Sequence, residues 1–237
     1  MALPVIATTT YTLTVPSTGQ KVKYRAFLVK EQKSLLIAQQ SEDPTVMVDT
    51  LKSIIHSCIL DKIDVDALAT FDLEFIFMQL RSRSVGEIAE LLFTCEQCKT
   101  GDILVRFDVS QLKVEIPEGH TKKIQLTDDI GIVLKYPSLD ILGKLQGVDS
   151  DSTDTNIIFD VIVSCIDYIY DATSVYMAKD STKEELNTFL ENLNSEQFNK
   201  IKGFFDSMPK LSQVVEYTCH ACGHHNVRNL RGITNFF

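Results

Sequence analysis

The stretch CHACGHH, residues 219–225, repeats the CxxC spacing of CEQC, residues 95–98. The chain has 237 residues and six cysteines, and four of the six fall in these two pairs. A CxxC pair on a tight turn points both sulfurs at one position, and two such turns supply the four ligands of a tetrahedral zinc site. We therefore predict that Cys95, Cys98, Cys219 and Cys222 bind one structural zinc ion.

Both pairs are flanked by apolar, β-branched runs, EIAELLF before the first pair and SQVVEYT before the second. This pattern predicts two β-hairpins with the cysteines at their tips. Two such hairpins facing each other form a zinc ribbon, although the separation of about 120 residues requires a whole subdomain between them. A site with four protein ligands has no open position, so the metal is expected to be structural.

Two alternatives to a four-cysteine zinc site stay open in the sequence. A CxxC pair that begins a helix supports thiol–disulfide exchange, but neither pair here begins a helical pattern. A site of three cysteines and one histidine is the second alternative, with His220, His224 or His225 as the ligand. Otherwise these histidines are expected to be exposed beside the turn or to donate a hydrogen bond to a sulfur.

The remaining cysteines, Cys58 and Cys165, lie in apolar runs that read as helices. We interpret them, together with His56, as buried packing residues rather than nucleophiles. The chain contains no GxSxG, GxxxxGK[ST], GxGxxG or HExxH motif. The sequence therefore predicts no enzyme and no small-molecule substrate.

Composition and charge limit the class of protein further. The chain is 44% hydrophobic and 23% charged, as in ordinary folded domains. It has no basic and apolar leader and no run of eighteen apolar residues, so we expect neither export nor a membrane span. A net charge of −9 with few cations near the cysteines argues against a nucleic-acid binder. Those cations are Lys99, Arg106, Arg228 and Arg231.

The N-terminal half predicts a hairpin over residues 11–26 and helices over 29–40, 44–58 and 69–87. Asp43 and Pro44 form a helix start, with Asp43 as N-cap. Short β-branched runs then predict four strands, over residues 102–109, 112–116, 122–126 and 131–136.

The C-terminal half reads as mainly helical, with a linker at 147–155. Its predicted helices cover residues 138–147, 156–171, 181–193 and 195–209, and Ser181 with Glu184 is expected to form a capping box. The aromatic residues of these helices are expected to pack in the core or, alternatively, to form a partner-binding face. They are Phe189, Phe198, Phe204 and Phe205.

The fold class expected from these elements is α+β, with a helical block inserted between the two zinc knuckles. Residues 1–85 form an N-terminal hairpin and helical region. Residues 86–136 and 210–237 form a discontinuous zinc-ribbon-like β subdomain, and residues 137–209 form the helical insertion.

Three stretches together resemble the T4-like bacteriophage baseplate hub subunit family. They are KYRAFLVKEQK at 23–33, the paired CEQC and CHAC knuckles, and the closing LRGITNFF. The resemblance spans nearly the whole chain. It implies a protein of contractile-tailed phages that is made in the host cytoplasm and located in the virion tail, as a subunit or an assembly factor of the central baseplate hub. Its implied partners are other hub and tail proteins, and it carries over no catalytic residue.

Two stretches are hypotheses for partner contacts, residues 24–32 and the terminal GITNFF at 232–237, unless they pack on their own domain. The alternative function is that of a zinc-ribbon regulator that binds nucleic acid or polymerase. Salt-dependent DNA binding would distinguish it, and the acidic balance predicts none.

Overall fold

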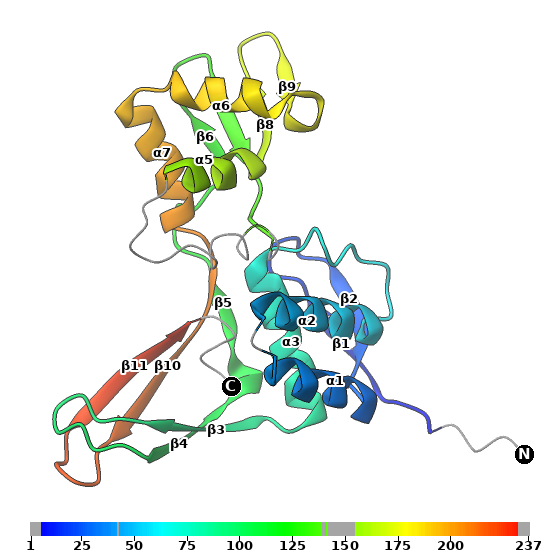
Figure 1. Cartoon of the computed structure of the whole chain (residues 1–237), viewed down its shortest axis with the longest axis vertical. Helices are drawn as coiled ribbons and strands as arrows, with labels where there is room; N and C mark the ends of the chain where they lie inside the picture. The colour runs from blue at the N-terminus through cyan, green and yellow to red at the C-terminus, as the bar shows by residue number, and fades with distance from the viewer. Residues whose placement is uncertain (1–5, 42, 139–140, 142–154, 232–237) are drawn as a thin grey trace, which may run out of the picture. The chain divides into compact units, whose positions relative to one another are not determined.

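The computed structural model describes residues 6–41, 43–138, 141 and 155–231. The chain folds into two compact units. Unit 1 contains residues 1–115 and 210–237, and unit 2 contains residues 116–209. Both units combine helices with small antiparallel sheets, so the chain is of the α+β class (Figure 1).

Unit 1 begins with a hairpin that packs near three helices. Strands β1 and β2 pair antiparallel with Leu13 opposite Val22, and both side chains are buried. Asp43 caps the second helix by accepting a hydrogen bond from the Thr45 N–H at 2.9 Å. The hairpin and the helices therefore lie where the sequence predicts them. Their bounds are β1 Thr10–Thr14, β2 Lys21–Arg25, α1 Val29–Gln39, α2 Pro44–Cys58 and α3 Thr70–Ser84.

The rest of unit 1 consists of two long hairpins. Strands β3 (Ile88–Phe93) and β4 (Ile103–Asp108) form a two-stranded sheet. Strands β10 (Lys210–Thr218) and β11 (His225–Arg231) form the second hairpin, to which the short strand β5 (Lys113–Glu115) adds along β10. A 3-10 turn, η1 (Val109–Gln111), connects β4 to β5. Figure 1 shows the two hairpins extending side by side with their turns together.

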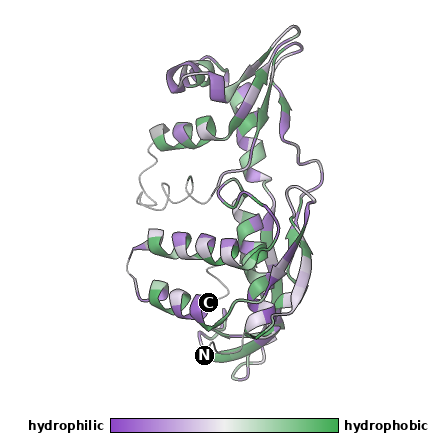
Figure 2. Cartoon of the chain, turned by 90° about the vertical axis from the view of Figure 1, so that its right-hand side faces the viewer, coloured by the Kyte–Doolittle hydropathy of each residue, from purple (hydrophilic) through white to green (hydrophobic). Residues whose placement is uncertain are grey.

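Unit 2 is a four-stranded antiparallel sheet in the order β6-β7-β8-β9, with helices packed against it. Ile124, Ile132 and Ile169 lie opposite one another on neighbouring strands and are buried against helix residues such as Leu190 and Ile201. Hydrophobic and hydrophilic residues alternate along the strands and around the helices, as expected for elements with one buried face (Figure 2). The bounds are β6 Lys123–Gln125, β7 Gly131–Leu134, α5 Thr155–Ser164, β8 Ile166–Tyr170, β9 Val175–Met177, η2 Ala178–Asp180, α6 Lys183–Glu191 and α7 Ser195–Asp206.

Two predictions for unit 2 are wrong. The run 156–171 is not one helix, because α5 ends at Ser164 and the β-branched and aromatic IDYIY continues as strand β8. The capping box lies one residue later than predicted, at Thr182 and Glu185, whose side chains each accept the other residue's backbone N–H. The inserted segment is therefore a mixed unit and not a helical block.

The boundary between the cysteine-bearing unit and the inserted unit lies after residue 115, whereas the sequence predicts it after residue 136. Strand β6 pairs with β7 and β7 pairs with β8, so residues 116–136 lie in unit 2 and not with the cysteine hairpins. The predicted helix at 138–147 and the linker at 147–155 fall almost entirely outside the described residues.

Candidate metal centre

The two CxxC turns have the same backbone geometry. In the first, the Cys95 N–H donates to the Thr100 carbonyl and the Lys99 N–H donates to the Cys95 carbonyl, at 2.8 and 3.1 Å. In the second, the Cys219 N–H donates to the His224 carbonyl and the Gly223 N–H donates to the Cys219 carbonyl, both at 2.9 Å. The chain thus forms the same turn at two positions that are far apart in sequence.

A positive φ angle at the fifth residue of each turn closes it. This residue is Gly223 in the second turn, with φ 72°, and Lys99 in the first, with φ 59°. Glycine adopts this left-handed conformation without steric cost, whereas lysine does not. The strain at Lys99 is therefore part of the turn that presents Cys95 and Cys98.

The hairpins bring all four predicted cysteines together. Their sulfur atoms all lie within 4.8 Å of one another. Two separations between the hairpins are 3.6 Å from Cys98 to Cys219 and 3.8 Å from Cys95 to Cys222. Cys95 and Cys219 are buried, while Cys98 and Cys222 are exposed. The cluster therefore lies at the surface with one side covered by protein.

These separations fit a tetrahedral metal site better than a disulfide. A zinc ion bound by four thiolates at about 2.3 Å has sulfurs about 3.8 Å apart at the corners of a tetrahedron. A disulfide requires about 2.05 Å, and all four cysteines are free. The donor set and its spacing are thus those of a possible four-thiolate metal site.

The cysteine pKa values show that the thiols affect one another. The hydroxyl and the backbone N–H of Thr100 lower the pKa of Cys98 to about 6. The backbone N–H of His224 lowers the pKa of Cys222, but burial and the neighbouring sulfurs outweigh it and raise that pKa to about 12. Close-packed thiols cannot all ionise without a cation between them, and a divalent metal supplies that charge.

Asn226 joins the two turns from a buried position in β11, with 1% of its surface exposed. Its side-chain oxygen accepts the Glu96 N–H at 3.0 Å, and its amide nitrogen donates to the His224 carbonyl at 3.1 Å. The same nitrogen lies 3.7 Å from the Cys95 sulfur and donates to it. One amide therefore contacts both turns and one of the thiols.

Three further contacts connect the hairpins beside the cysteines. The Tyr217 hydroxyl donates to the Thr94 carbonyl at 3.0 Å, and its ring stacks on Phe93 with centroids 5.2 Å apart. At the rim, Arg228 pairs with Glu96 at 3.2 Å. The sequence identifies Arg228 only as a cation near the cysteines, and its patterns do not point to Tyr217 or Asn226. The available signal for Asn226 was a polar residue on the inward-facing side of a strand next to a CxxC turn.

The other sequence candidates lie away from the cluster or do not complete it. Among the described residues the cluster contains cysteines alone, with His220 and His225 exposed and His224 contributing its carbonyl to the turn. Cys58 is buried at the end of α2, as predicted. Cys165 is buried too, but it lies between α5 and β8 rather than inside a helix. His56 is exposed, so its predicted burial is wrong.

The other residues that the sequence suggests for partner contacts differ in how exposed they are. Within 24–32 the rings of Tyr24 and Phe27 are buried in unit 1, while Val29 is 81% exposed. GITNFF lies outside the described residues. In unit 2, Phe204 is buried in the core and three further rings pack against it, which confirms the core interpretation. These are Phe189, Phe198 and Phe205.

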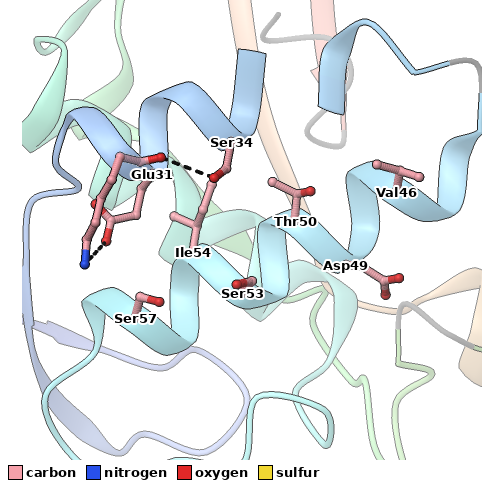
Figure 3. Close-up of a pocket in the computed structure, with 9 residues that line it drawn as sticks. Glu31, Ser34, Val46, Asp49, Thr50, Ser53, Ile54 and Ser57 are labelled. Atoms are coloured by element: carbon pink, nitrogen blue, oxygen red, sulfur yellow. Dashed lines mark hydrogen bonds and ion pairs between the residues drawn. The ribbon is translucent and has the colours of Figure 1, made fainter. Parts of the chain in front are cut away.

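A separate groove lies between α1 and α2 (Figure 3). Hydroxyl groups line much of it, together with the side chain of Ile54. At one end, Glu31 is held by Arg25 at 2.8 Å and by Lys30 at 3.4 Å, so the charges there are paired. The groove has no cluster of metal-binding side chains among the residues that the structure describes. Its hydroxyl residues are Ser34, Thr50, Ser53 and Ser57.

Comparison with known protein families assigns the chain to one family over nearly its full length. The family model described as T4 bacteriophage base plate protein matches residues 8–237. The chain belongs to this base plate family. As a base plate protein it is a component of the phage tail system, and both cysteine turns lie within the matched range. Searches of curated proteins and of solved structures found no match.

Helix length adds one separate fact about this base plate protein. In the part of the chain that the structure describes, no helix combines the length and apolarity that a membrane crossing requires.

Proposed function

We propose that this base plate protein is a non-enzymatic structural or assembly component of the central baseplate hub, stabilised by a structural zinc ion. Cys95, Cys98, Cys219 and Cys222 are the proposed ligands. The observation that carries the proposal is the four-sulfur cluster at the tips of two hairpins, in a chain that matches a base plate family from residue 8 to residue 237.

The proposed metal would act through chain topology. The two pairs are more than 120 residues apart, and all of unit 2 lies between them. A crosslink that closes so long a loop removes conformational entropy from the unfolded chain, and metal binding then contributes directly to folding. The zinc ion would hold the ends of the two hairpins together while unit 2 folds around its own core.

The charges around the turns support this proposal over a zinc-ribbon regulator of transcription. Arg106 pairs with Glu90 at 2.7 Å, and Arg228 pairs with Glu96 at 3.2 Å. Each of these guanidinium groups has a carboxylate beside it, whereas nucleic-acid affinity depends on clustered cations that contact phosphates. Together with the net charge of −9, this favours protein partners in the tail.

Quantitative mass spectrometry of purified mature phage particles and of tail intermediates tests the hub proposal. A fixed ratio to known baseplate proteins in mature particles would identify a permanent subunit. Presence in intermediates alone would identify an assembly factor. Absence from both would contradict the proposal, as would tight, salt-dependent DNA binding by the purified zinc-loaded chain.

A further inference from the structure

Unit 2 contains a hollow of about 440 Å³ between the β8–β9 hairpin and helix α6. We propose that this hollow is a docking site for an arginine side chain of a partner protein. That the partner is a baseplate component rests on the proposed function, whereas the chemistry of the hollow follows from the residues that line it.

The floor of the hollow is apolar. Ile169 and Leu186 form part of it and are 9% and 7% exposed, and Phe189 packs against the same core. Ile130 and Tyr176 are more exposed, at 37% and 50%. A side chain with a long hydrocarbon stem would cover these apolar groups while its polar end remained near the rim.

The rim carries three carboxylates, those of Asp171, Asp180 and Glu185. Asp171 accepts hydrogen bonds from the Thr173 N–H at 2.7 Å and the Tyr176 hydroxyl at 2.9 Å. These bonds fix Asp171 and Tyr176 as a rigid wall, and they lower the pKa of Asp171 to about 2, so its charge persists at neutral pH.

The other two carboxylates have acceptor capacity left. One Glu185 oxygen accepts the Thr182 N–H that caps α6, which leaves its second oxygen for another donor. Asp180 is exposed at the end of η2, next to Ser181 on the same rim. Two carboxylates therefore offer oxygens at the mouth of an apolar hollow.

No lysine or arginine lines the hollow among the residues that the structure describes. The nearby Lys183 is held outside it by Asp160 at 2.8 Å. Lys123 lies over the ring of Tyr170, which also lines the hollow, 4.8 Å from the ring centroid. The hollow is thus an apolar recess with three negative charges and no cation among its described lining residues. Its charge complement is a cationic side chain with an apolar stem.

Arginine fits this description better than lysine. A planar guanidinium group stacks on an aromatic face and forms two parallel hydrogen bonds to carboxylate oxygens, whereas an ammonium group is a more strongly hydrated point charge. Tyr176 supplies the aromatic wall, and Asp180 and Glu185 supply the acceptors. Arginine is also among the residues that contribute most to protein interfaces.

The test uses the full zinc-loaded chain, labelled with ¹⁵N, and three small probes. They are the N-acetyl amides of arginine, lysine and citrulline, and citrulline has nearly the shape of arginine without its charge. We expect saturable millimolar binding of the arginine probe, with chemical-shift changes centred on Tyr176, Asp180 and Leu186. The lysine probe is expected to bind more weakly, and the citrulline probe roughly fivefold or more weakly.

Two variants with matched chemistry make the test specific. Asp180→Asn removes one rim charge at an exposed position and is expected to weaken arginine binding roughly threefold or more. Glu184→Gln removes an equivalent charge from the first turn of α6, at a residue that does not line the hollow, and is expected to leave binding unchanged.

Three results would overturn the proposal. They are equal shifts with arginine and citrulline, shifts that map outside the hollow, and equal losses in both variants. The same shifts produced by calcium ions alone would assign the hollow to a cation instead. None of these results bears on the particle composition that tests the proposed function, so the two proposals can fail separately.

Discussion

The cysteine hairpins of unit 1 and the sheet of unit 2 are stabilised in different ways. In unit 2 a four-stranded sheet buries Ile132, Leu134 and Ile166 under helices that add Leu190 and Ile201. The β3–β4 hairpin has two strands and leaves large apolar side chains on one face at least half exposed, namely Ile88, Leu92 and Leu104.

A two-stranded hairpin is marginally stable by itself in water. The ends of the unit 1 hairpins are instead joined by four sulfurs, one buried asparagine and one tyrosine contact. Where a chain cannot bury enough apolar surface, a metal crosslink can replace part of a core. We therefore expect the cysteine hairpins of unit 1 to depend on metal and unit 2 to depend on packing.

Removing a ligand should have the largest effect. Cys95→Ser or Cys222→Ser is expected to abolish stoichiometric zinc and to lower the Tm of unit 1 by about 10 °C or more. Elemental analysis and calorimetry measure both quantities. Cys165→Ala is the control, because Cys165 is buried in unit 2, and it should keep one zinc per chain. Unchanged zinc in either ligand variant would reject the assignment.

Removing core volume from unit 2 should give the opposite pattern. Ile132 is fully buried among the residues of the unit 2 core. Ile132→Ala is expected to destabilise that unit by about 2–5 kcal/mol, because it deletes buried methyl groups and leaves a cavity. Zinc content should stay the same. If zinc were lost as well, the two units would not be independent in the way proposed here.

Asn226 should have an intermediate effect that is specific to the metal. Asn226→Ala removes hydrogen bonds to Glu96, His224 and Cys95, which predicts a loss of about 1–3 kcal/mol. Metal affinity should fall about 10–100-fold, as for other residues that orient ligands. The charge-transfer bands of the cobalt-substituted protein should shift, because one sulfur loses its donor.

Asn229→Ala is the matched control for Asn226, since Asn229 is exposed on the same strand. It should change neither the spectrum nor the affinity. A stability loss in Asn226→Ala with an unaltered cobalt spectrum would assign Asn226 a packing role only.

The smallest expected effect is the pH dependence of unit 2. The His120 Nδ1–H donates to Ser207 at 2.9 Å, and its Nε2 accepts from the Tyr136 hydroxyl at 3.0 Å, because the Ser207 hydroxyl itself donates to Gly203. This arrangement suits the neutral ring. Burial, together with the charge of Lys122, lowers the pKa of His120 below 6.5.

The sign of this dependence follows from the lowered pKa. The unfolded chain takes up the proton first, so the contribution of His120 is complete above about pH 6.5 and is lost as the pH falls below it. Thermal melts at about pH 7.5 and about pH 5.5 should therefore differ less in His120→Gln than in the unaltered chain. His56→Gln, at an exposed position, should not change the difference.

The local patterns were enough to predict the elements of unit 1 and the cysteine cluster. Asp43 with Pro44 marked a helix start, and the two CxxC pairs between β-branched runs marked hairpin tips. Those signals depend on residues close in sequence. The apolar run 156–171 was wrongly predicted as one helix because its pattern fits a helix and a buried strand equally well. Pairing with β7 makes the residues after Ser164 a strand.

The polar residues of the two candidate sites were beyond prediction for a related reason. The partners of Asn226 lie as far as 131 positions away in the chain. The hollow in unit 2 is lined by residues of strand β8 and helix α6, and the sequence predicts a helix where β8 lies. Neither contact leaves a pattern of fixed spacing in one sequence.

X-ray absorption at the zinc edge of the purified chain tests the central claim most directly. We expect one zinc per chain with four sulfur neighbours at about 2.3 Å and no nitrogen neighbour. A shell with a nitrogen would move one ligand to a histidine. A chain that is folded without any metal, with its cysteines oxidised in pairs, would show that the four cysteines are not a structural zinc site.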